Sequence, residues 1–343
     1  MARADVTILG AGIFGLSIAW ACAKRGARVR VIDPGGVGAG SSGGLVGALS
    51  PHVPEAWNTK KAFQFGSLLM AGDWWAEVVA ASGRSAGYAR LGRLQPLADQ
   101  AAVDLARERA ASAAKLWQGK AQWEVVPATG GALEPRSATG WLVRDTLAAR
   151  LSPRLALESL AVAILNRGAT LERSGESVGT VVHATGVAGL AALSESLGRK
   201  VGTGVKGQAL ALRFTAPDAP QILVDGLHIV PHADGTVAVG STSERDWQSE
   251  GPDGQLDGLL AKAVDAVPAL GEAEVVARWA GVRPRAASRA PVLGAWPGRP
   301  GHFVANGGFK IGFGMAPGVA EVMAELVLEG RDWVPDGFRL TAP

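Results

Sequence analysis

The chain has 343 residues, of which 48% are hydrophobic and 19% charged, and its formal net charge is +3. This length exceeds what one hydrophobic core usually supports, so it predicts two domains, and the composition excludes a disordered or fibrous protein. The small net charge and the lack of a dense Lys/Arg run disfavour nucleic-acid binding. A single cysteine, Cys22, excludes an intramolecular disulfide and a cysteine-based zinc site.

The N-terminal segment MARADVTILG shows no charged leader followed by a cleavable apolar stretch. Gly and Pro interrupt the apolar segments before they reach the roughly 18 residues that a membrane-spanning helix needs. We therefore expect a cytoplasmic protein without a transmembrane segment. The histidines are scattered without ligand spacing, so we expect no metal site.

The first predicted elements are a strand ending at Leu9 and a helix that follows a glycine-rich turn. Gly10, Gly12 and Gly15 have the Gly-x-Gly-x-x-Gly spacing of dinucleotide-binding proteins. The first glycine permits the tight turn, the second lets the backbone approach a pyrophosphate, and the third lets helix and strand pack closely. Free N–H groups at the start of the helix suit the phosphates. This turn therefore predicts a bound dinucleotide.

A second strand is predicted at residues 27–33, and it ends at Asp33, 23 positions after Gly10. A carboxylate there can accept both hydroxyls of an adenosine ribose and would repel a 2′-phosphate, so NADP is disfavoured. The glycine spacing alone serves NAD and FAD equally. The small-residue segment 35–47 takes the place of a third strand and helix, which favours a large ligand; a mobile loop is the alternative interpretation.

Farther along, the pattern predicts helices at residues 66–80 and 101–118, with a strand at 178–183 before a glycine-ended turn. Strand-like alternation at residues 209–214, 222–231 and 235–243, with a hairpin signal at 233–235, predicts a second sheet. The helices are expected to border that sheet. A strand at 303–305, a glycine-rich turn and an amphipathic helix ending near Gly330 close the chain.

Six short motifs follow one another along the chain: GAGIFG (10–15), SSGGLVG (41–47), HATG (183–186), VKGQ (205–208), GVRP (281–284) and GFKIGFGMAP (308–317). In these motifs and in their order, the chain resembles the D-amino-acid oxidase and glycine oxidase family of FAD-dependent oxidoreductases over nearly its whole length. The resemblance implies an α/β fold with a Rossmann-like FAD-binding domain and a discontinuous second domain on an antiparallel β-sheet. The FAD domain is expected at residues 1–75, 145–195 and 276–343, and the substrate domain at 76–144 and 196–275.

The resemblance also implies which residues contact FAD. They are Gly10, Gly12, Ile13, Phe14, Gly15, Asp33, Pro34, Ser41, Ser42, Gly43, Gly44, Leu45, Ala184, Thr185, Gly186, Gly308, Phe309, Lys310, Ile311, Gly312 and Phe313. The related sarcosine oxidases attach flavin through a cysteine in the C-terminal region. Because Cys22 lies in the first helix, we expect noncovalent FAD.

Three residues are expected to act on the substrate. Arg283 matches the arginine that the family uses as a bidentate clamp on the amino acid's carboxylate, although it could instead form an interdomain salt bridge. Lys310 matches a second position, commonly arginine, beside the substrate. His228 stands where the family usually has a tyrosine; it could donate to a carboxylate, sense pH near neutrality or be structural.

The resulting prediction is FAD-dependent oxidation of a small amino acid or related amine of the glycine, sarcosine or D-amino acid type. A hydride would pass from the α-carbon to flavin N5, and the imine would hydrolyse. Oxygen or another acceptor would reoxidise the flavin. The alternatives are a NAD-dependent dehydrogenase and a noncatalytic flavin-binding subunit of a complex. Substrate identity and oligomeric state are not predicted.

Overall fold

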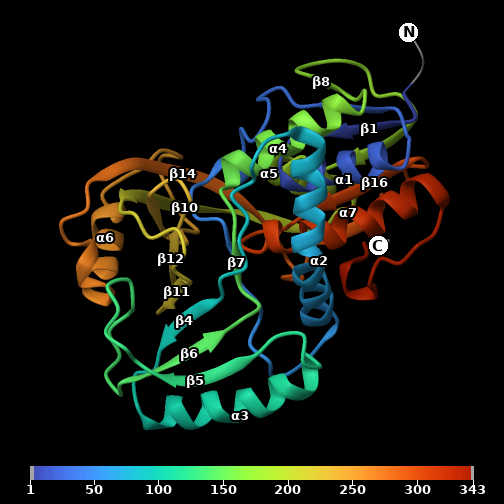
Figure 1. Ribbon diagram of the computed structural model, residues 1–343. Helices are drawn as coiled ribbons and strands as arrows, with labels where there is room; N and C mark the ends of the chain where they lie inside the picture. The colour runs from blue at the N-terminus through green and yellow to red at the C-terminus, as the bar shows by residue number, and fades with distance from the viewer. Residues whose placement is uncertain (1–3, 341–343) are drawn as a thin grey trace.

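The computed structural model describes residues 4–340 and contains a six-stranded sheet, an eight-stranded sheet and a short two-stranded ribbon. In Figure 1 the six-stranded sheet and its helices lie at the upper right, and helix α3 (Gln100–Leu116) lies at the bottom beside the far end of the eight-stranded sheet. None of the helices in residues 4–340 combines the length and apolar character required to cross a bilayer.

The six-stranded sheet is mostly parallel and has the strand order β15-β16-β9-β1-β2-β8. Its strands are β1 (Val6–Leu9), β2 (Val29–Ile32), β8 (Thr170–Glu172), β9 (Thr180–His183), β15 (Val292–Ala295) and β16 (His302–Asn306). Only β15 pairs antiparallel, at one edge. Three separate parts of the chain therefore build one nucleotide-binding type of sheet, with β1 at its centre between β2 and β9.

Four helices pack on this sheet, α1 (Ile13–Lys24), α4 (Pro153–Asn166), α5 (Gly186–Ser196) and α7 (Gly312–Glu329), and α2 (Thr59–Ser82) packs on α4 and α7. Helix α1 is buried from Ile13 to Ala23, because it packs against α4 and α7 as well as the sheet. Its apolar sequence, with Trp20 only 1% exposed, is the reason that it can be buried on every side.

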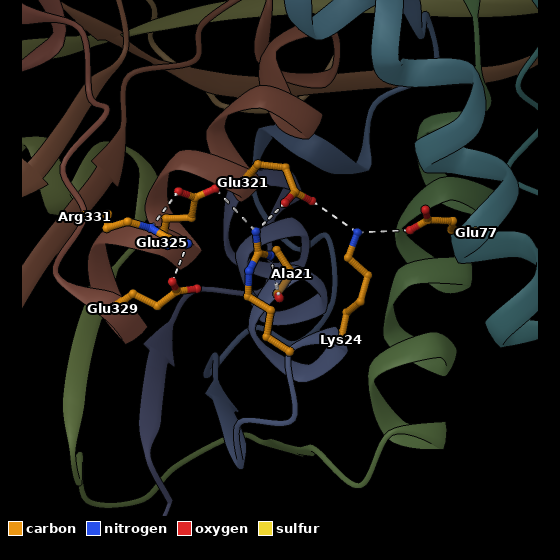
Figure 2. Close-up of polar contacts among 8 residues, drawn as sticks. Ala21, Lys24, Glu77, Glu321, Glu325, Glu329 and Arg331 are labelled. Atoms are coloured by element: carbon orange, nitrogen blue, oxygen red, sulfur yellow. Dashed lines mark hydrogen bonds and ion pairs between the residues drawn. The ribbon is translucent and has the colours of Figure 1, made fainter.

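Charged side chains join three of these helices, α1, α2 and α7, at the C-terminal end of α1 (Figure 2). Arg25 Nη2 lies 2.6 Å from a Glu321 carboxylate oxygen, and Lys24 Nζ lies 3.3 Å from the other. Lys24 also reaches Glu77 of α2 at 3.0 Å. The network ties α1 to α2 and α7, and the basic residues lie where a helix C-terminus favours positive charge.

The eight-stranded sheet has the order β14-β10-β13-β12-β11-β4-β6-β5 and is antiparallel except for the β11–β4 pair. Its strands are β4 (Arg93–Pro96), β5 (Trp123–Pro127), β6 (Trp141–Asp145), β10 (Gly202–Arg213), β11 (Gln221–Val224), β12 (Leu227–Pro231), β13 (Thr236–Gly240) and β14 (Val275–Ala286). Helix α6 (Gln255–Ala266) packs on β10, and α3 packs on β5. The predicted hairpin at residues 233–235 is confirmed between β12 and β13.

Two features differ from the sequence-based expectations. Helix α2, expected at 66–80 beside the second sheet, starts earlier at Thr59, where Asn58 caps it, and packs on α4 and α7 instead. Strand β14 pairs with β10 along its length, so residues 276–286, which we assigned to the FAD domain, lie in the eight-stranded sheet. The exact domain boundaries stay a prediction.

The ribbon of β3 (Ala48–Leu49) and β7 (Ala149–Arg150) lies at the junction of the two sheets. Buried Arg150 donates to the carbonyl of Pro231 at 2.6 Å, and Gln221 donates to the carbonyl of Ala149 at 2.8 Å. His232 and the carbonyl of Leu45 are 3.0 Å apart. These contacts connect the glycine-rich segment to β11 and β12, so both parts of the molecule contribute to the space between them.

Candidate active site

One large cavity, of about 1600 Å³, is lined by residues of both sheets. Its walls come from the β1–α1 turn, segment 33–48, the β9–α5 turn, His228 of β12, residues 279–284 of β14 and the loop between β16 and α7. The N-terminal ends of α1 and α7 therefore border the same space, since Ile13 and Phe14 of α1 and Gly312 and Phe313 of α7 line it.

The β1–α1 turn forms a cradle that only glycine permits. Gly10 has φ of +107°, and a Cβ there would overlap with the carbonyl oxygen of Ala184. At Gly12 a Cβ would come within 3.1 Å of the Ser42 hydroxyl and extend into the cavity wall. Gly15 does not line the cavity; a Cβ there would overlap with the carbonyl oxygen of Gly10, so this glycine serves helix–strand packing.

Asp33 lies at the end of β2 and faces the cavity beside Pro34. One carboxylate oxygen accepts from the N–H of Ala11 at 2.7 Å, and the other accepts from the N–H of Gly35 at 2.9 Å. Both bonds come from the backbone, so the carboxylate is held in place while each oxygen retains a further lone pair. This arrangement fits a ribose that donates its two hydroxyls.

The small-residue segment after Asp33 is anchored to the rest of the site. Residues Ser41–Gly43 form a short 3₁₀ turn, and the Ser42 hydroxyl accepts from the N–H of Ile13 at 3.1 Å. Gly38 donates to the carbonyl of Ala11 at 3.0 Å, and Arg154 donates to the carbonyl of Gly43 at 3.0 Å. Ser41, Gly43, Gly44 and Leu45 line the cavity as well. The contacts favour the ligand-wrapping interpretation over a mobile loop.

The β16–α7 loop closes the cavity on another side, next to the β9–α5 turn of Ala184, Thr185 and Gly186. Asn306, 3% exposed, donates to the carbonyl of Gly186 at 2.8 Å and accepts from the N–H of Gly307 at 2.7 Å. Gly308 lies against the Phe14 ring, where a Cβ would approach within 2.9 Å. Phe309, Lys310, Gly312 and Phe313 line the cavity, whereas Ile311 is the residue before α7 and does not.

Arg283 of β14 lines this cavity and is only 8% exposed. Its Nη1 donates to the carbonyl of Thr242 at 3.2 Å, and no carboxylate of residues 4–340 forms an ion pair with it. Burial lowers the pKa of Arg283 to about 10, with nearby Glu244 acting in the opposite direction. The guanidinium is therefore charged at neutral pH, and the alternative of an interdomain salt bridge finds no partner in the described part of the chain.

Lys310 and His228 line the same cavity. Burial, and then the charge of Arg283, holds the pKa of Lys310 below its usual value. Burial, followed by the charges of Arg93 and Lys310, lowers the pKa of His228 to about 4. His228 is therefore a neutral imidazole near pH 7, which argues against pH sensing in that range, and its buried Nδ1 has no partner among the described residues.

The structure adds site residues that the motifs did not indicate. The Trp279 indole lies against Gly44 and Gly281, where added Cβ atoms would come within 3.4 and 2.5 Å of it. Trp247, in the loop after β13, lines the cavity too. Alternation along β14 offered a signal for Trp279, because Trp279, Gly281 and Arg283 occupy every second position. Trp247 lies in a loop with no periodic pattern and gave no such signal.

The glycine cradle, the carboxylate at the end of β2 and the adjoining cationic space together define a dinucleotide-dependent oxidoreductase. The chain belongs to the DAO family of FAD-dependent oxidoreductases, whose model matches residues 5–326. FAD is accordingly its cofactor, and the predicted family, fold class and cofactor are confirmed. The cradle at Gly10 and Gly12 and the oxygens of Asp33 are the groups of this chain that fit the FAD diphosphate and ribose.

Individual relatives cover nearly the whole chain. A glycine oxidase of Geobacillus kaustophilus is 29% identical over 95% of this chain and 93% of its own length. A putative thiamine biosynthesis oxidoreductase ThiO of Rhizobium etli is 31% identical over 94% of this chain and 96% of its own.

Solved structures show the same fold. The crystal structure of glycine oxidase from Geobacillus kaustophilus superposes with a TM-score of 0.86 at 24% identity, over 99% of both chains. That of iminodiacetate oxidase from Chelativorans sp. BNC1 has a TM-score of 0.84 at 24% identity, over 98% of this chain and 99% of the other.

Proposed function

We propose that this protein oxidises a small amino acid or related amine of the glycine, sarcosine or D-amino acid type at its FAD. The observation that carries the proposal is Arg283, a buried and charged guanidinium without a carboxylate partner among residues 4–340, in the cavity that also contains the glycine cradle. A buried cation of this kind suits a carboxylate supplied by a ligand. The relatives named as glycine oxidases support the same substrate class.

The chain's own residues would fix the substrate by its carboxylate. Arg283 would hold both oxygens through its planar fork, and Lys310 would add a second positive charge beside them. Neutral His228 has one ring N–H to donate. Trp279 and Trp247 would keep water from the donor carbon, since both line the cavity. These contacts position the α-carbon, which is the contribution that binding energy makes to such a reaction.

FAD, when bound, supplies the redox chemistry by accepting a hydride from the α-carbon at N5, while the amine lone pair forms the C=N bond. The imine product then hydrolyses in water to a carbonyl compound and an amine or ammonia. We infer that FAD is held noncovalently, because Cys22, the sole cysteine, is 0% exposed inside α1 and burial raises the pKa of its thiol to about 12. Oxygen or another acceptor would reoxidise the flavin.

Anaerobic mixing of the purified holoenzyme with glycine, sarcosine, D-amino acids, L-proline and larger N-substituted amines tests the proposal. We expect at least one carboxylated amine to bleach the visible band of oxidised flavin. Readmitting air should restore the band and release hydrogen peroxide if oxygen is the acceptor, whereas slow recovery would point to another acceptor. If no amine bleaches the flavin, the noncatalytic flavin-binding alternative replaces this proposal.

A further inference from the structure

A polar cluster lies directly behind Arg283 and is not used in the proposed reaction. It consists of Lys206 and Gln208 on β10, Thr242 and Glu244 in the loop after β13, and Asp253 before α6. Lys206 Nζ lies 2.8 Å from an Asp253 oxygen and 3.4 Å from Glu244 Oε2. Gln208 donates to Glu244 Oε1 at 3.1 Å, and its side-chain oxygen accepts from the N–H of Asp253 at 2.8 Å. The cluster is thus fully connected.

The cluster contains charges that are costly to leave unpaired. The Lys206 side chain is 1% exposed and that of Glu244 is 9% exposed, whereas Asp253 is 42% exposed. Burial alone would raise the pKa of Glu244, but hydrogen bonds from Thr242 and Gln208 and the charge of Lys206 outweigh it and hold the pKa below its usual value. Glu244 is therefore an anion, and Lys206 is the cation in ion-pair contact with it.

Arg283 lies beside this anion without pairing to it. Its guanidinium lies against Gly207, the residue between Lys206 and Gln208 in the sequence, and a Cβ at Gly207 would overlap with it. Thr242 connects the two charges, since its carbonyl accepts from Arg283 while its hydroxyl donates to Glu244. The charge of Glu244 acts on the pKa of Arg283, so the two groups interact electrostatically although no ion pair forms.

We propose that Lys206 is a positioning residue that keeps Glu244 away from Arg283, so that the guanidinium stays available for the substrate carboxylate. Without Lys206, the nearly buried Glu244 carboxylate would take Arg283 as its counter-ion, because a buried anion without a cation is strongly unfavourable. Glu244 would then compete with the substrate for the same fork. This inference rests on the proposed role of Arg283 as the carboxylate-binding group.

The experiment titrates holoenzyme variants with glycolate, an oxygen analogue of glycine that cannot be oxidised through an amine, and follows the flavin absorbance. For Lys206→Met we expect binding weakened by about 10-fold or more, since Glu244 competes for Arg283. Glu244→Gln alone should bind glycolate as well as the natural protein or better. The double variant Lys206→Met/Glu244→Gln should recover most of the loss. Lys262→Met, on the exposed face of α6, controls for removal of a lysine charge.

A purely structural role predicts a different pattern. The loop after β13 is fastened to β10 by the same contacts. If Lys206 is only structural, Lys206→Met should lower the melting temperature, and adding Glu244→Gln to it should not restore glycolate binding. Absence of rescue, or weaker glycolate binding in Glu244→Gln itself, would overturn the inference. If Lys206→Met fails to fold, Lys206→Arg takes its place in the test. Because it retains the positive charge, it should bind glycolate as the natural protein does.

The outcome also separates this inference from the proposed function. If the natural holoenzyme binds glycolate through Arg283, shown by loss of binding in Arg283→Ala, but Lys206→Met binds it equally well, only the positioning role of Lys206 fails. If Arg283→Ala binds glycolate as tightly as the natural protein, the carboxylate-binding role of Arg283 fails first.

Discussion

The two halves of the cavity are built in different ways. The half that suits the FAD diphosphate and ribose consists mainly of backbone: the glycine turn at Gly10 and Gly12, and Asp33, whose oxygens are held by two N–H groups. The half that suits the substrate consists of side chains from separate strands and loops, among them His228, Arg283 and Lys310. A backbone site tolerates almost no substitution, whereas a side-chain site can change its specificity one residue at a time.

The backbone half can be broken by a single methyl group. Gly10→Ala places a Cβ against the carbonyl of Ala184 at φ of +107°, and we expect a cost of about 4 kcal/mol from overlap and backbone strain. The variant should purify with less than about a tenth of the natural flavin content if this turn binds the pyrophosphate, as its glycine spacing predicts. The ratio of flavin to protein absorbance measures the effect.

The matched control for that change is Gly258→Ala in α6, where an added Cβ meets nothing within 4 Å. It should keep its full flavin content and be slightly more stable, since alanine favours helix. Normal flavin content in Gly10→Ala would show that the turn does not hold the cofactor.

The substrate half should respond to Arg283→Ala with a loss of function but no loss of cofactor. Removing a buried, charge-assisted bidentate contact should cost about 3 kcal/mol of transition-state stabilisation, or roughly 100-fold in kcat/KM. Arg283→Lys should recover only part of this, because an ammonium cannot match both oxygens in one plane. Arg278→Ala, on the same strand but exposed, is the control. Flavin loss with normal kinetics would instead indicate a structural arginine.

The same contrast explains what the sequence revealed. The glycine turn, Asp33 and the β16–α7 loop are short, contiguous motifs whose spacing follows from local backbone geometry, and their elements were predicted. Arg283 was reached only through the family resemblance. Lys206 and Glu244 were missed as functional candidates, because the isolated bridge and ion pair between them join segments some 40 residues apart in the sequence. Trp247 was missed because it lies in a loop without a periodic pattern. Helix α2 was placed beside the wrong sheet, since periodicity indicates an apolar face but not its partner.

Burial of the substrate half predicts an acid sensitivity that His228→Gln should reduce. The pKa of His228 is about 4 in the folded protein, below the ordinary value near 6.5, so the unfolded chain binds the extra proton between these values. The contribution of neutral His228 to the free energy of unfolding is therefore fully present above about pH 6.5 and is lost as the pH drops towards 4. At pH 5 the loss from this residue is about 2 kcal/mol. Urea midpoints at pH 8 and pH 5 should differ less in His228→Gln. An equal difference in both proteins would contradict the low pKa.

The smallest effect on stability is expected in the ion-pair network at the C-terminal end of α1. Glu321→Gln removes one member of the network in Figure 2, in which Glu321 and Arg25 are each 23% exposed. Partly exposed ion pairs contribute little, so we expect about 0.5 kcal/mol lower stability, reduced further by salt, and normal flavin content. Thermal melts at low and high salt measure this. Flavin loss here would mean that the network, and not the glycine turn, positions α1.

The central claim, that Arg283 selects a carboxylated amine for oxidation, is tested most directly by comparing sarcosine with dimethylamine, the same amine without its carboxylate. Anaerobic flavin reduction by each should be measured in the natural protein and in Arg283→Ala. We predict that the natural protein prefers sarcosine by about 100-fold or more, and that this preference nearly disappears in the variant. An unchanged preference in Arg283→Ala would contradict the account.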